Sequence, residues 1–300
     1  MWVNMIILKS FLHETIWGGD RLKQYIDENV DKIGHLYSVA GSKSKSNMIL
    51  NGEYKGKDFY TYFNENKNKY GLSDYEEYPL TIALVDASDN LSIQVHPSKK
   101  TAYELENKES GKNESFYILV PPSNGEMYNG CKCNSIEEVE NKIKYGQSDQ
   151  IADKLKVQKG DYIYVTEGTL HSLSAGALVY EIEENCEYTY RLYDFERLDS
   201  QGNKRPLDIE KVLKALDVSK KSVVKKYNNK EIEENRYITK LVENVSHYKN
   251  HSDTLECLTI LEGNGMIDGI LIKIGMSIIL EPDEQVDNIN IIKAIAARTK

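Results

Sequence analysis

Two histidines, a glutamate and a glutamine occur beside strand-like stretches at spacings that suit a metal site. The segment "LSIQVHPSKK" at 91–100 places Gln94 two residues before His96. Positions i and i+2 of a β-strand face the same side, so these two side chains project together. Glu114 opens the next strand-like stretch, and His171 follows a third, "GDYIYVTEGTLHSL" at 160–173.

Antiparallel strands of a barrel can bring inward-facing side chains from three such places to one point. Two imidazoles, a carboxylate and an amide oxygen form a hard to borderline ligand set that suits zinc and leaves room for water or substrate. Spacing alone leaves a second interpretation open, in which each histidine is an ordinary side chain with satisfied hydrogen bonds.

The elements that must position these residues are mostly short strands rich in Ile, Val, Leu, Tyr and Thr, separated by Gly, Asn, Asp and Pro turns. This pattern predicts a sandwich or jelly roll, and the lack of alternating strands and long helices disfavours a parallel α/β fold. The expected strands include "PLTIALVDA", "LSIQVH", "SFYILV", "DYIYVTEG", "ALVYEIEE" and "YTYRLYDF".

Helices are expected to be few. "DIEKVLKALD" from Asp208 has apolar residues at helical spacing behind an Asp cap, and "SIEEVENKIKYG" opens with a capping box from Ser135 to Glu138. A short helix and a loop are expected over 58–78. The segment 218–236 loses periodicity and is the best candidate for a domain boundary, with "KKSVVKK" interpreted as a solvated linker or helix end. Strands resume after it.

Composition excludes several classes of function. The chain has 300 residues, 40% hydrophobic and 28% charged, and a net charge of -9. Such an acidic chain does not suit a nucleic-acid surface, which requires clustered Lys and Arg. The four cysteines show no metal-finger spacing and indicate a reduced, cytoplasmic protein. No apolar run reaches the roughly 20 residues of a membrane helix, and the N-terminus lacks the basic leader of a secretory signal.

Several of these motifs together resemble the type I mannose-6-phosphate isomerases, in particular their short bacterial form. The resemblance covers about residues 5–220. It is carried by "IWGGDRL" at 16–22, "LNGEYKGKDF" at 50–59, "LSIQVHPSKK", "GKNESFYIL" at 111–119, "GDYIYVTEGTLHSL" and "EYTYRLYDFERLDSQGNKRPLDI" at 187–209. It implies a mostly β fold: a cupin-type jelly-roll catalytic domain over 1–220, with a few packing helices, and a smaller C-terminal β-barrel over 235–300.

The resemblance also implies roles for individual residues. One Zn²⁺ per chain would be held by Gln94, His96, Glu114 and His171. Catalytic roles fall on Arg191, Lys112 and Glu181, and substrate binding falls on Trp17, Ser92, Lys112 and Glu187. The implied reaction interconverts mannose 6-phosphate and fructose 6-phosphate through an enediol, which requires an acid/base group and cationic donors for the sugar oxygens or the phosphate. The implied partner is a sugar phosphate, with no nucleic acid or membrane, for a monomer or homodimer.

Other interpretations of single residues remain open. Arg191 could form an ion pair with Asp194 or Glu187, Lys112 could be a loop cation, and Trp17 could be a core or interface aromatic. His13, His247 and His251 match no motif of the family and are expected at the surface.

The sequence also departs from the family's pattern. "IGHLYSVAG" at 33–41 places His35 where the family is usually acidic and Tyr37 where it usually has Trp. Glu187 replaces an Asp, and Glu167 stands where a Pro is common. His35 and Glu187 motivate an alternative, a catalytically weak paralogue that binds a sugar phosphate as a sensor. A third hypothesis, an iron-dependent cupin oxygenase, is disfavoured because Gln94 replaces the first histidine of the usual pair.

Overall fold

The computed structural model describes residues 5–26, 30–199, 201–228 and 230–300, and the chain within them is mostly β. The first sheet has seven strands in the order β14-β10-β7-β12-β5-β3-β2. Every pair of neighbouring strands whose register is defined is antiparallel. Its strands are β2 (Phe11–Gly19), β3 (Ile33–Val39), β5 (Leu80–Asp86), β7 (Glu114–Val120), β10 (Tyr162–Val165), β12 (Leu178–Glu184) and β14 (Val224–Lys225).

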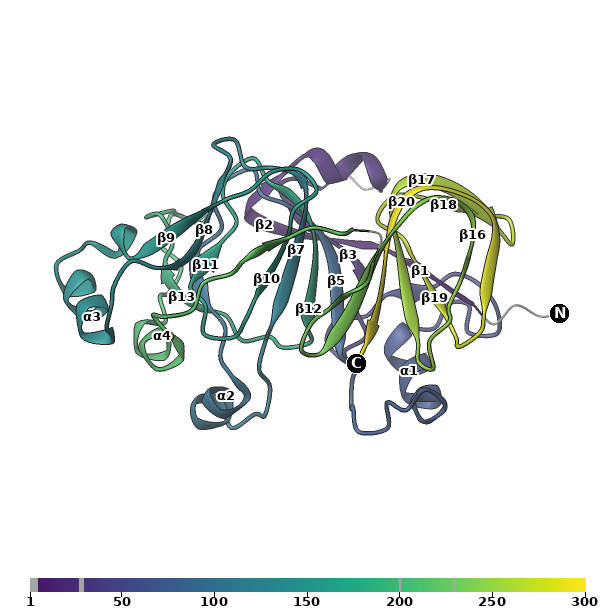
Figure 1. Cartoon of the computed structure of the whole chain (residues 1–300), viewed down its shortest axis with the longest axis horizontal. Coiled ribbons are helices and arrows are strands. Elements are labelled where there is room, and N and C mark those ends of the chain that lie inside the picture. Colours follow the sequence, from purple (N-terminus) through teal and green to yellow (C-terminus); the bar gives the residue numbers. More distant parts are fainter. Residues whose placement is uncertain (1–4, 27–29, 200, 229) are drawn as a thin grey trace.

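A five-stranded sheet of order β13-β6-β11-β8-β9 faces the first one (Figure 1). Its strands are β6 (Ile93–Val95), β8 (Glu126–Cys131), β9 (Ala152–Lys156), β11 (His171–Ser172) and β13 (Tyr190–Tyr193). An apolar cluster joins the two sheets, because Phe116 and Val179 of the first contact the same core as Met127 of the second. Two antiparallel sheets packed in this way confirm the predicted jelly-roll class.

The third sheet contains the C-terminal strands and has the order β15-β16-β20-β17-β19-β1-β4, with β18 beside β17. Its strands are β1 (Ile6–Lys9), β4 (Met48–Ile49), β15 (Ile232–Glu233), β16 (Tyr237–Lys249), β17 (Glu256–Ile267), β18 (Ile270–Ile272), β19 (Ser277–Leu280) and β20 (Gln285–Thr299). The predicted C-terminal strands are therefore present, and two strands from the beginning of the chain pair with them.

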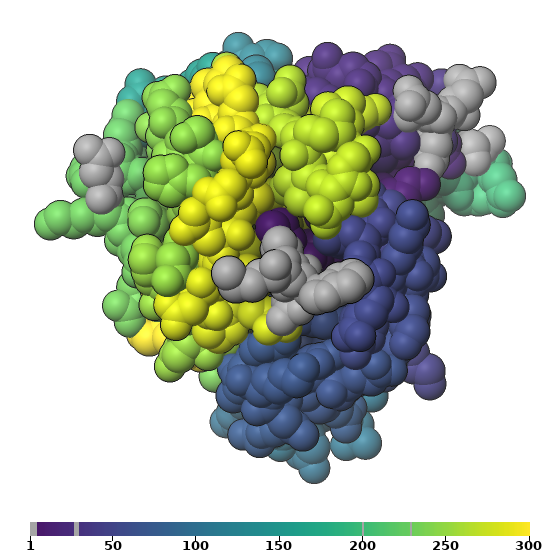
Figure 2. Space-filling model, turned by 90° about the vertical axis from the view of Figure 1, so that its right-hand side faces the viewer, coloured from purple at the N-terminus to yellow at the C-terminus, as the bar shows by residue number. Residues whose placement is uncertain are grey.

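The first and third sheets share a core. Leu36, Leu84 and Ile182 on the outer face of the seven-stranded sheet belong to one apolar cluster with Phe59 and Cys257. Figure 2 shows the C-terminal strands in yellow next to the segment in blue that contains α1 (Phe59–Asn66).

The helices cover the ends and outer faces of the sheets. They are α1, α2 (Lys99–Glu106), α3 (Ile136–Lys144) and α4 (Ile209–Ala215), with short 3-10 helices η1 (Arg21–Tyr25), η2 (Lys67–Tyr70) and η3 (Ser148–Gln150). Val139 of α3 and Val212 of α4 pack with Ile93 and Val95 on the outer face of the five-stranded sheet. The other face of β6 is therefore left for Gln94 and His96, as predicted.

Three local predictions need correction or refinement. Ser135 caps α3 by accepting a hydrogen bond from the Glu138 amide (3.2 Å), but the Glu138 carboxylate returns to the Asn134 amide rather than to Ser135. Asp208 stands at the start of α4 without capping it, because its carboxylate accepts from the Arg191 amide (3.0 Å). The segment "KKSVVKK" is neither linker nor helix end, since β14 within it pairs with β10 as an edge strand.

Candidate metal centre and its surroundings

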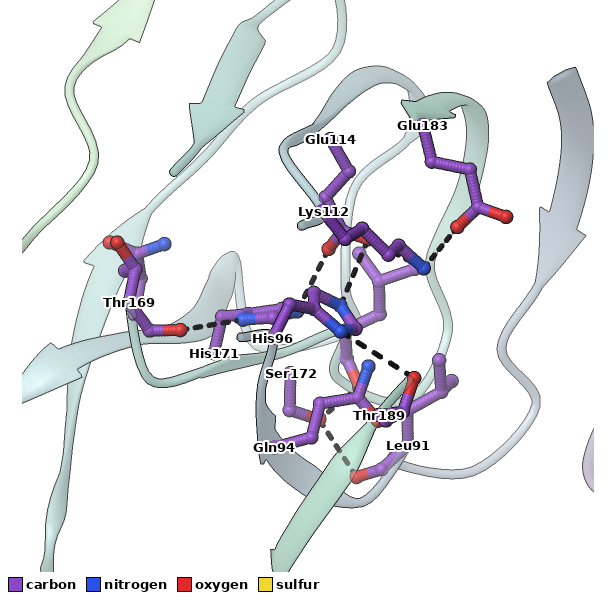
Figure 3. Close-up of polar contacts among 12 residues, drawn as sticks. Leu91, Gln94, His96, Lys112, Glu114, Thr169, His171, Ser172, Glu183 and Thr189 are labelled. Carbon is purple, nitrogen blue, oxygen red and sulfur yellow. Dashed lines mark hydrogen bonds and ion pairs between the residues drawn. The ribbon is translucent and has the colours of Figure 1, made fainter. Parts of the chain in front are cut away.

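The five-stranded sheet presents Gln94, His96 and His171 on one face. Gln94 of β6 lies directly opposite His171 of β11, and directly opposed residues of antiparallel strands share a face. His96 follows β6 two residues after Gln94 and projects to the same side (Figure 3). The pairing of β6 with β11, which is distant in sequence, therefore brings together two of the three segments that were predicted to converge.

Glu114 approaches from the opposite sheet rather than from a neighbouring strand of the same one. It is the first residue of β7, and its two carboxylate oxygens lie 3.2 Å from His96 Nε2 and 2.8 Å from His171 Nε2. All three side chains are 1% exposed. A ligand bound by this group would join the two sheets of the jelly roll.

Each imidazole is oriented by its other nitrogen. His96 Nδ1 lies 3.0 Å from the Tyr188 carbonyl oxygen, and His171 Nδ1 lies 2.9 Å from that of Thr169. Because a carbonyl oxygen only accepts, both Nδ1 atoms carry a proton, and each ring directs its Nε2 toward Glu114. Carbonyl groups orient metal-bound histidines in the same way.

The atoms at the centre of this cluster face one another and have no hydrogen-bond partner outside it in the described chain. His96 Nε2, His171 Nε2 and Glu114 Oε1 are all buried without one among the described residues. Lone pairs facing a carboxylate in a buried site are unfavourable unless a cation or proton lies between them. Two imidazole nitrogens and a carboxylate oxygen are ligands that zinc accepts, so these residues fit a bound divalent metal.

Lys112 supplies positive charge beside this cluster. Its Nζ is 3.3 Å from Glu114 Oε2 and forms an ion pair with Glu183. Burial opposes ionisation of the amine, but Glu183, Glu114 and Glu181 outweigh burial and raise the pKa of Lys112 well above its ordinary value. Lys112 is thus a buried, charged residue and not a loop cation in solvent.

The carboxylates around Lys112 are held in different states. Burial favours the neutral form of Glu114, yet His96, Lys112 and His171 hold its pKa well below the ordinary value. Burial, together with the charges of Glu183 and Glu114, raises the pKa of Glu181 well above the ordinary value. The ionised form is therefore favoured at Glu114, whereas the protonated form is favoured at Glu181.

Glu183 was not predicted as part of this site. Glu181 and Glu183 are two residues apart on β12, so their side chains lie on the same face of the sheet. This spacing is a sequence signal that could have identified the pair. Glu114, Glu181 and Glu183 also lie close enough to one another to hold a cation. Among the described residues, the Lys112 ammonium already fills that role for Glu183 and Glu114.

Arg191 lies beside Gln94 on the side away from His171. It is opposite Gln94 in the pairing of β13 with β6, so the row Arg191, Gln94, His171 crosses three strands. Asp194 pairs with Arg197 and Arg205 instead, and Glu187 accepts a hydrogen bond from Ser44. The Nε atom of Arg191 is buried without a hydrogen-bond partner in the described part of the chain.

The remaining predicted residues lie at different depths. Ser92 is buried and donates from Oγ to Gln94 Oε1 (3.0 Å), which orients the amide. Trp17 is buried in the core between the two sheets and meets the His35 ring edge to face at 5.2 Å. Glu187 is exposed, as are His13, His247 and His251. Within the described part of the chain, neither Trp17 nor Glu187 forms a hydrogen bond or ion pair with His96, Glu114 or His171.

A surface hollow of ≈ 720 Å³ borders the site from outside. Its lining includes Ser44, Glu187 and Tyr188, but not His96, Glu114 or His171. Because the Tyr188 carbonyl oxygen holds His96, the 184–188 segment forms a wall between this hollow and the metal cluster. The cluster itself therefore lies between the two sheets and does not line the hollow.

Comparison with known proteins places the chain in a family. Residues 5–116 match the model of the phosphomannose isomerase type I catalytic domain. A mannose-6-phosphate isomerase of Streptococcus mutans is 34% identical over 218 residues, which is 72% of this chain and 68% of that protein. Mannose-6-phosphate isomerase ManA of Bacillus subtilis is 31% identical over 219 residues, 73% of this chain and 70% of that protein.

The solved structures agree over nearly the whole chain. The crystal structure of the Bacillus subtilis mannose 6-phosphate isomerase superimposes with a TM-score of 0.83 at 26% identity, covering 98% of this chain and 99% of that one. A putative mannosephosphate isomerase from Archaeoglobus fulgidus has a TM-score of 0.80 at 19% identity, with 100% and 99% covered, and supports the fold alone.

The fold and the buried His/Glu/His group define a mostly β enzyme with a possible metal site. The chain belongs to the type I phosphomannose isomerase family and is an isomerase. The predicted resemblance is thereby confirmed. Within the described residues, no helix is both long and apolar enough to cross a membrane.

Proposed function

We propose that this isomerase interconverts mannose 6-phosphate and fructose 6-phosphate with one Zn²⁺ bound by Gln94, His96, Glu114 and His171. The observation that supports it most directly is the convergence, between the two sheets, of three buried ligand atoms that have no hydrogen-bond partner outside the cluster among the residues described. The names of the relatives supply the substrate pair. Gln94 is assigned as the fourth ligand because it faces the same side as both histidines.

The reaction moves a proton between C1 and C2 of the open-chain sugar through an enediol, so it needs a proton carrier and stabilisation of the oxygens. Bound zinc would supply Lewis-acid polarisation of those oxygens. Glu181 is the proposed acid/base group, because its pKa is raised well above the ordinary value, which favours the protonated form. Lys112 remains charged beside Glu114 and donates to oxygen that becomes negative.

Arg191 is proposed to bind the reacting oxygens from the other side of Gln94. Its guanidinium has a buried Nε without a partner and no ion pair with Asp194 or Glu187 in the described chain. A planar fork of donors suits two oxygens of an enediolate at once. Trp17, Ser92, Lys112 and Glu187 are proposed to bind substrate, with Ser92 acting through Gln94.

A coupled assay for fructose 6-phosphate formation tests this function. Zinc-loaded protein is compared with protein treated with a chelator and with chelated protein to which zinc is restored. We expect turnover of mannose 6-phosphate in the first and third samples and its loss in the second. Zinc-loaded, folded protein that forms no fructose 6-phosphate would overturn the proposal, and metal analysis showing iron with oxygen uptake would favour an oxygenase.

A catalytically weak sensor is the second candidate, and the environment of His35 is the observation that favours it. His35 has a buried Nδ1 without a partner at a position where the family is usually acidic. Saturable binding of mannose 6-phosphate without turnover would support the sensor.

Three further assignments are proposals that follow from the family. We propose a cytoplasmic location, a monomeric or homodimeric state, and two domains, 1–220 and 235–300. The pairing of β1 and β4 with the C-terminal sheet ties the first domain to the second.

A further inference from the structure

The inner face of the seven-stranded sheet continues well beyond the candidate metal ligands. Glu181 on β12 is opposite Ala83 on β5, and Ala83 is opposite Tyr37 on β3. Neighbouring strands are about 4.8 Å apart, so Tyr37 lies roughly 10 Å from Glu181 across the sheet. Ala83 carries only a methyl group, so the side chain between the longer ones of Glu181 and Tyr37 is short.

The Tyr37 end of this face is aromatic and carries nitrogen atoms. His35 stacks on Tyr37 with ring centroids 5.3 Å apart and an interplanar angle of 6°. Burial, and then the charges of His13 and Lys45, lower the pKa of His35 to about 3, so its imidazole is neutral. Its Nδ1 is buried without a hydrogen-bond partner among the described residues and can bond a polar group of a ligand.

Lys45 adds a positive charge at this end. It belongs to a turn closed by the Gly41–Ser46 bridge and by the hydrogen bond from the Ser42 amide to the Lys45 carbonyl (2.9 Å). Its Nζ lies 4.2 Å from the centroid of the Tyr37 ring. Burial raises the pKa of Glu181, whereas Lys45 is among the charges that lower it, so the ammonium acts on the same interior.

The pairing of Lys45 differs from that of other cations around the two sheets. Arg21 pairs with Asp86, Lys112 with Glu183, and Arg197 with Asp194. Within the described chain, Lys45 forms no ion pair with a carboxylate, and its ammonium rests against Tyr37. A half-buried cation without an anionic partner is available to an anionic ligand.

An open-chain hexose 6-phosphate carries its reacting carbonyl at one end and its phosphate at the other. Lys112 and Arg191 both lie beside the proposed metal ligands, at the carbonyl end. We infer that Lys45 binds the phosphate at the opposite end, with His35 contacting a sugar hydroxyl between phosphate and metal. This inference rests on the proposed function and assigns the direction in which the substrate lies.

Kinetics of Lys45→Met test the inference, with Lys43→Met as a matched control because Lys43 is exposed on the same turn. With zinc-loaded protein, we expect KM for mannose 6-phosphate to rise at least about tenfold in Lys45→Met while kcat stays within about twofold. Lys45→Arg is expected to restore most of the affinity, and Lys43→Met to match the wild type.

Binding of fructose 6-phosphate and of inorganic phosphate to metal-free protein provides a readout independent of turnover. Calorimetry is expected to show at least about tenfold weaker binding to Lys45→Met and unchanged binding to Lys43→Met. Unchanged KM and binding in a Lys45→Met protein that melts like the wild type would overturn the inference, as would a loss confined to kcat. If the wild type does not turn over mannose 6-phosphate, the proposed function fails, and Lys45-dependent phosphate binding still decides the role of Lys45.

Discussion

The space between the two N-terminal sheets and the interior of the C-terminal sheet are both enclosed by antiparallel strands, but they are filled differently. The C-terminal interior contains a cluster of Ile, Leu, Val, Met and Ala side chains with Tyr248. In the N-terminal part, imidazoles, carboxylates and Lys112 share the interior with apolar residues.

The difference extends to hydrogen bonding. Within the described chain, the buried side-chain nitrogen and oxygen atoms that lack a partner belong to residues between Thr15 and Arg197, and none is in the C-terminal strands. Unpartnered buried polar atoms reduce stability. Three of these atoms, on His96, Glu114 and His171, meet at one point between the two N-terminal sheets, which indicates that this interior is arranged for binding and the C-terminal one for packing.

The largest expected effect comes from removing a proposed metal ligand. His96→Ala and His171→Ala are each expected to lose zinc and at least about 100-fold in activity, because changes in residues that merely orient ligands already cost up to that much. Metal content by mass spectrometry and isomerase kinetics are measured on the same preparations. Zinc at wild-type stoichiometry in either variant would show that the ligands are wrongly assigned.

The C-terminal interior should respond in stability and not in chemistry. Leu258 is fully buried on β17, and Leu258→Ala is expected to lower the free energy of unfolding by about 2–5 kcal/mol through lost contacts and a cavity. Urea denaturation measures this loss. Zinc content and kcat/KM of the folded protein are expected to stay at wild-type values, and a large fall in either would contradict the proposed separation of roles.

A smaller change tests the geometry of the N-terminal interior. Arg191→Lys is expected to keep the fold and zinc yet lose at least about tenfold in kcat/KM, or roughly 1.4 kcal/mol, because an ammonium offers one contact where a guanidinium offers a fork. The comparison uses variant and wild type with equal zinc content and melting temperature. Near-wild-type kcat/KM would remove Arg191 from the catalytic set.

The smallest expected effect concerns acid stability. The folded pKa of His35 is about 3, below its ordinary value of 6.5, so the unfolded chain binds the extra proton between these values and stability falls as pH drops from 6.5 toward 3. The limit is about 1.4 kcal/mol per pH unit, and partial exposure of the ring reduces it to roughly 1.

The matching variant is His35→Gln, which has no titrating group. Unfolding of metal-free protein at pH 7 and pH 5 is expected to show a smaller loss for His35→Gln than for the wild type. Equal losses would mean that His35 is protonated as easily in the folded protein as in the unfolded one.

The sequence predicted strands better than it predicted how sheets face each other. The two-residue periodicity around His96 correctly assigned the polar and apolar faces of β6, because that periodicity is local. Nothing local revealed that Glu114 reaches the histidines from the opposite sheet, since this depends on sheet packing. Likewise, the short "KKSVVKK" strand depends on an available edge at β10 and not on its own propensity.

The candidate site was predicted in the same uneven way. Motifs identified His96, Glu114 and His171, which the structure brings together, while the roles of all proposed site residues stay predictions. The free state of Arg191 could not be read from sequence, because its nearest acidic neighbour Asp194 is taken by Arg197 and Arg205. Lys45 was missed for the same reason: its position depends on how a turn folds over Tyr37.

The pairing of β1 with β19 has a consequence for the order of synthesis and folding. Ile6 pairs with Ile279, so β1 can pair with β19 only after the whole segment between these two residues has been synthesised. Contacts between such distant residues slow folding, because a long loop must close before they form. Until then, the side of the apolar stretch "IILK" that pairs with β19 is an open edge, which makes the nascent chain prone to association and a substrate for chaperones.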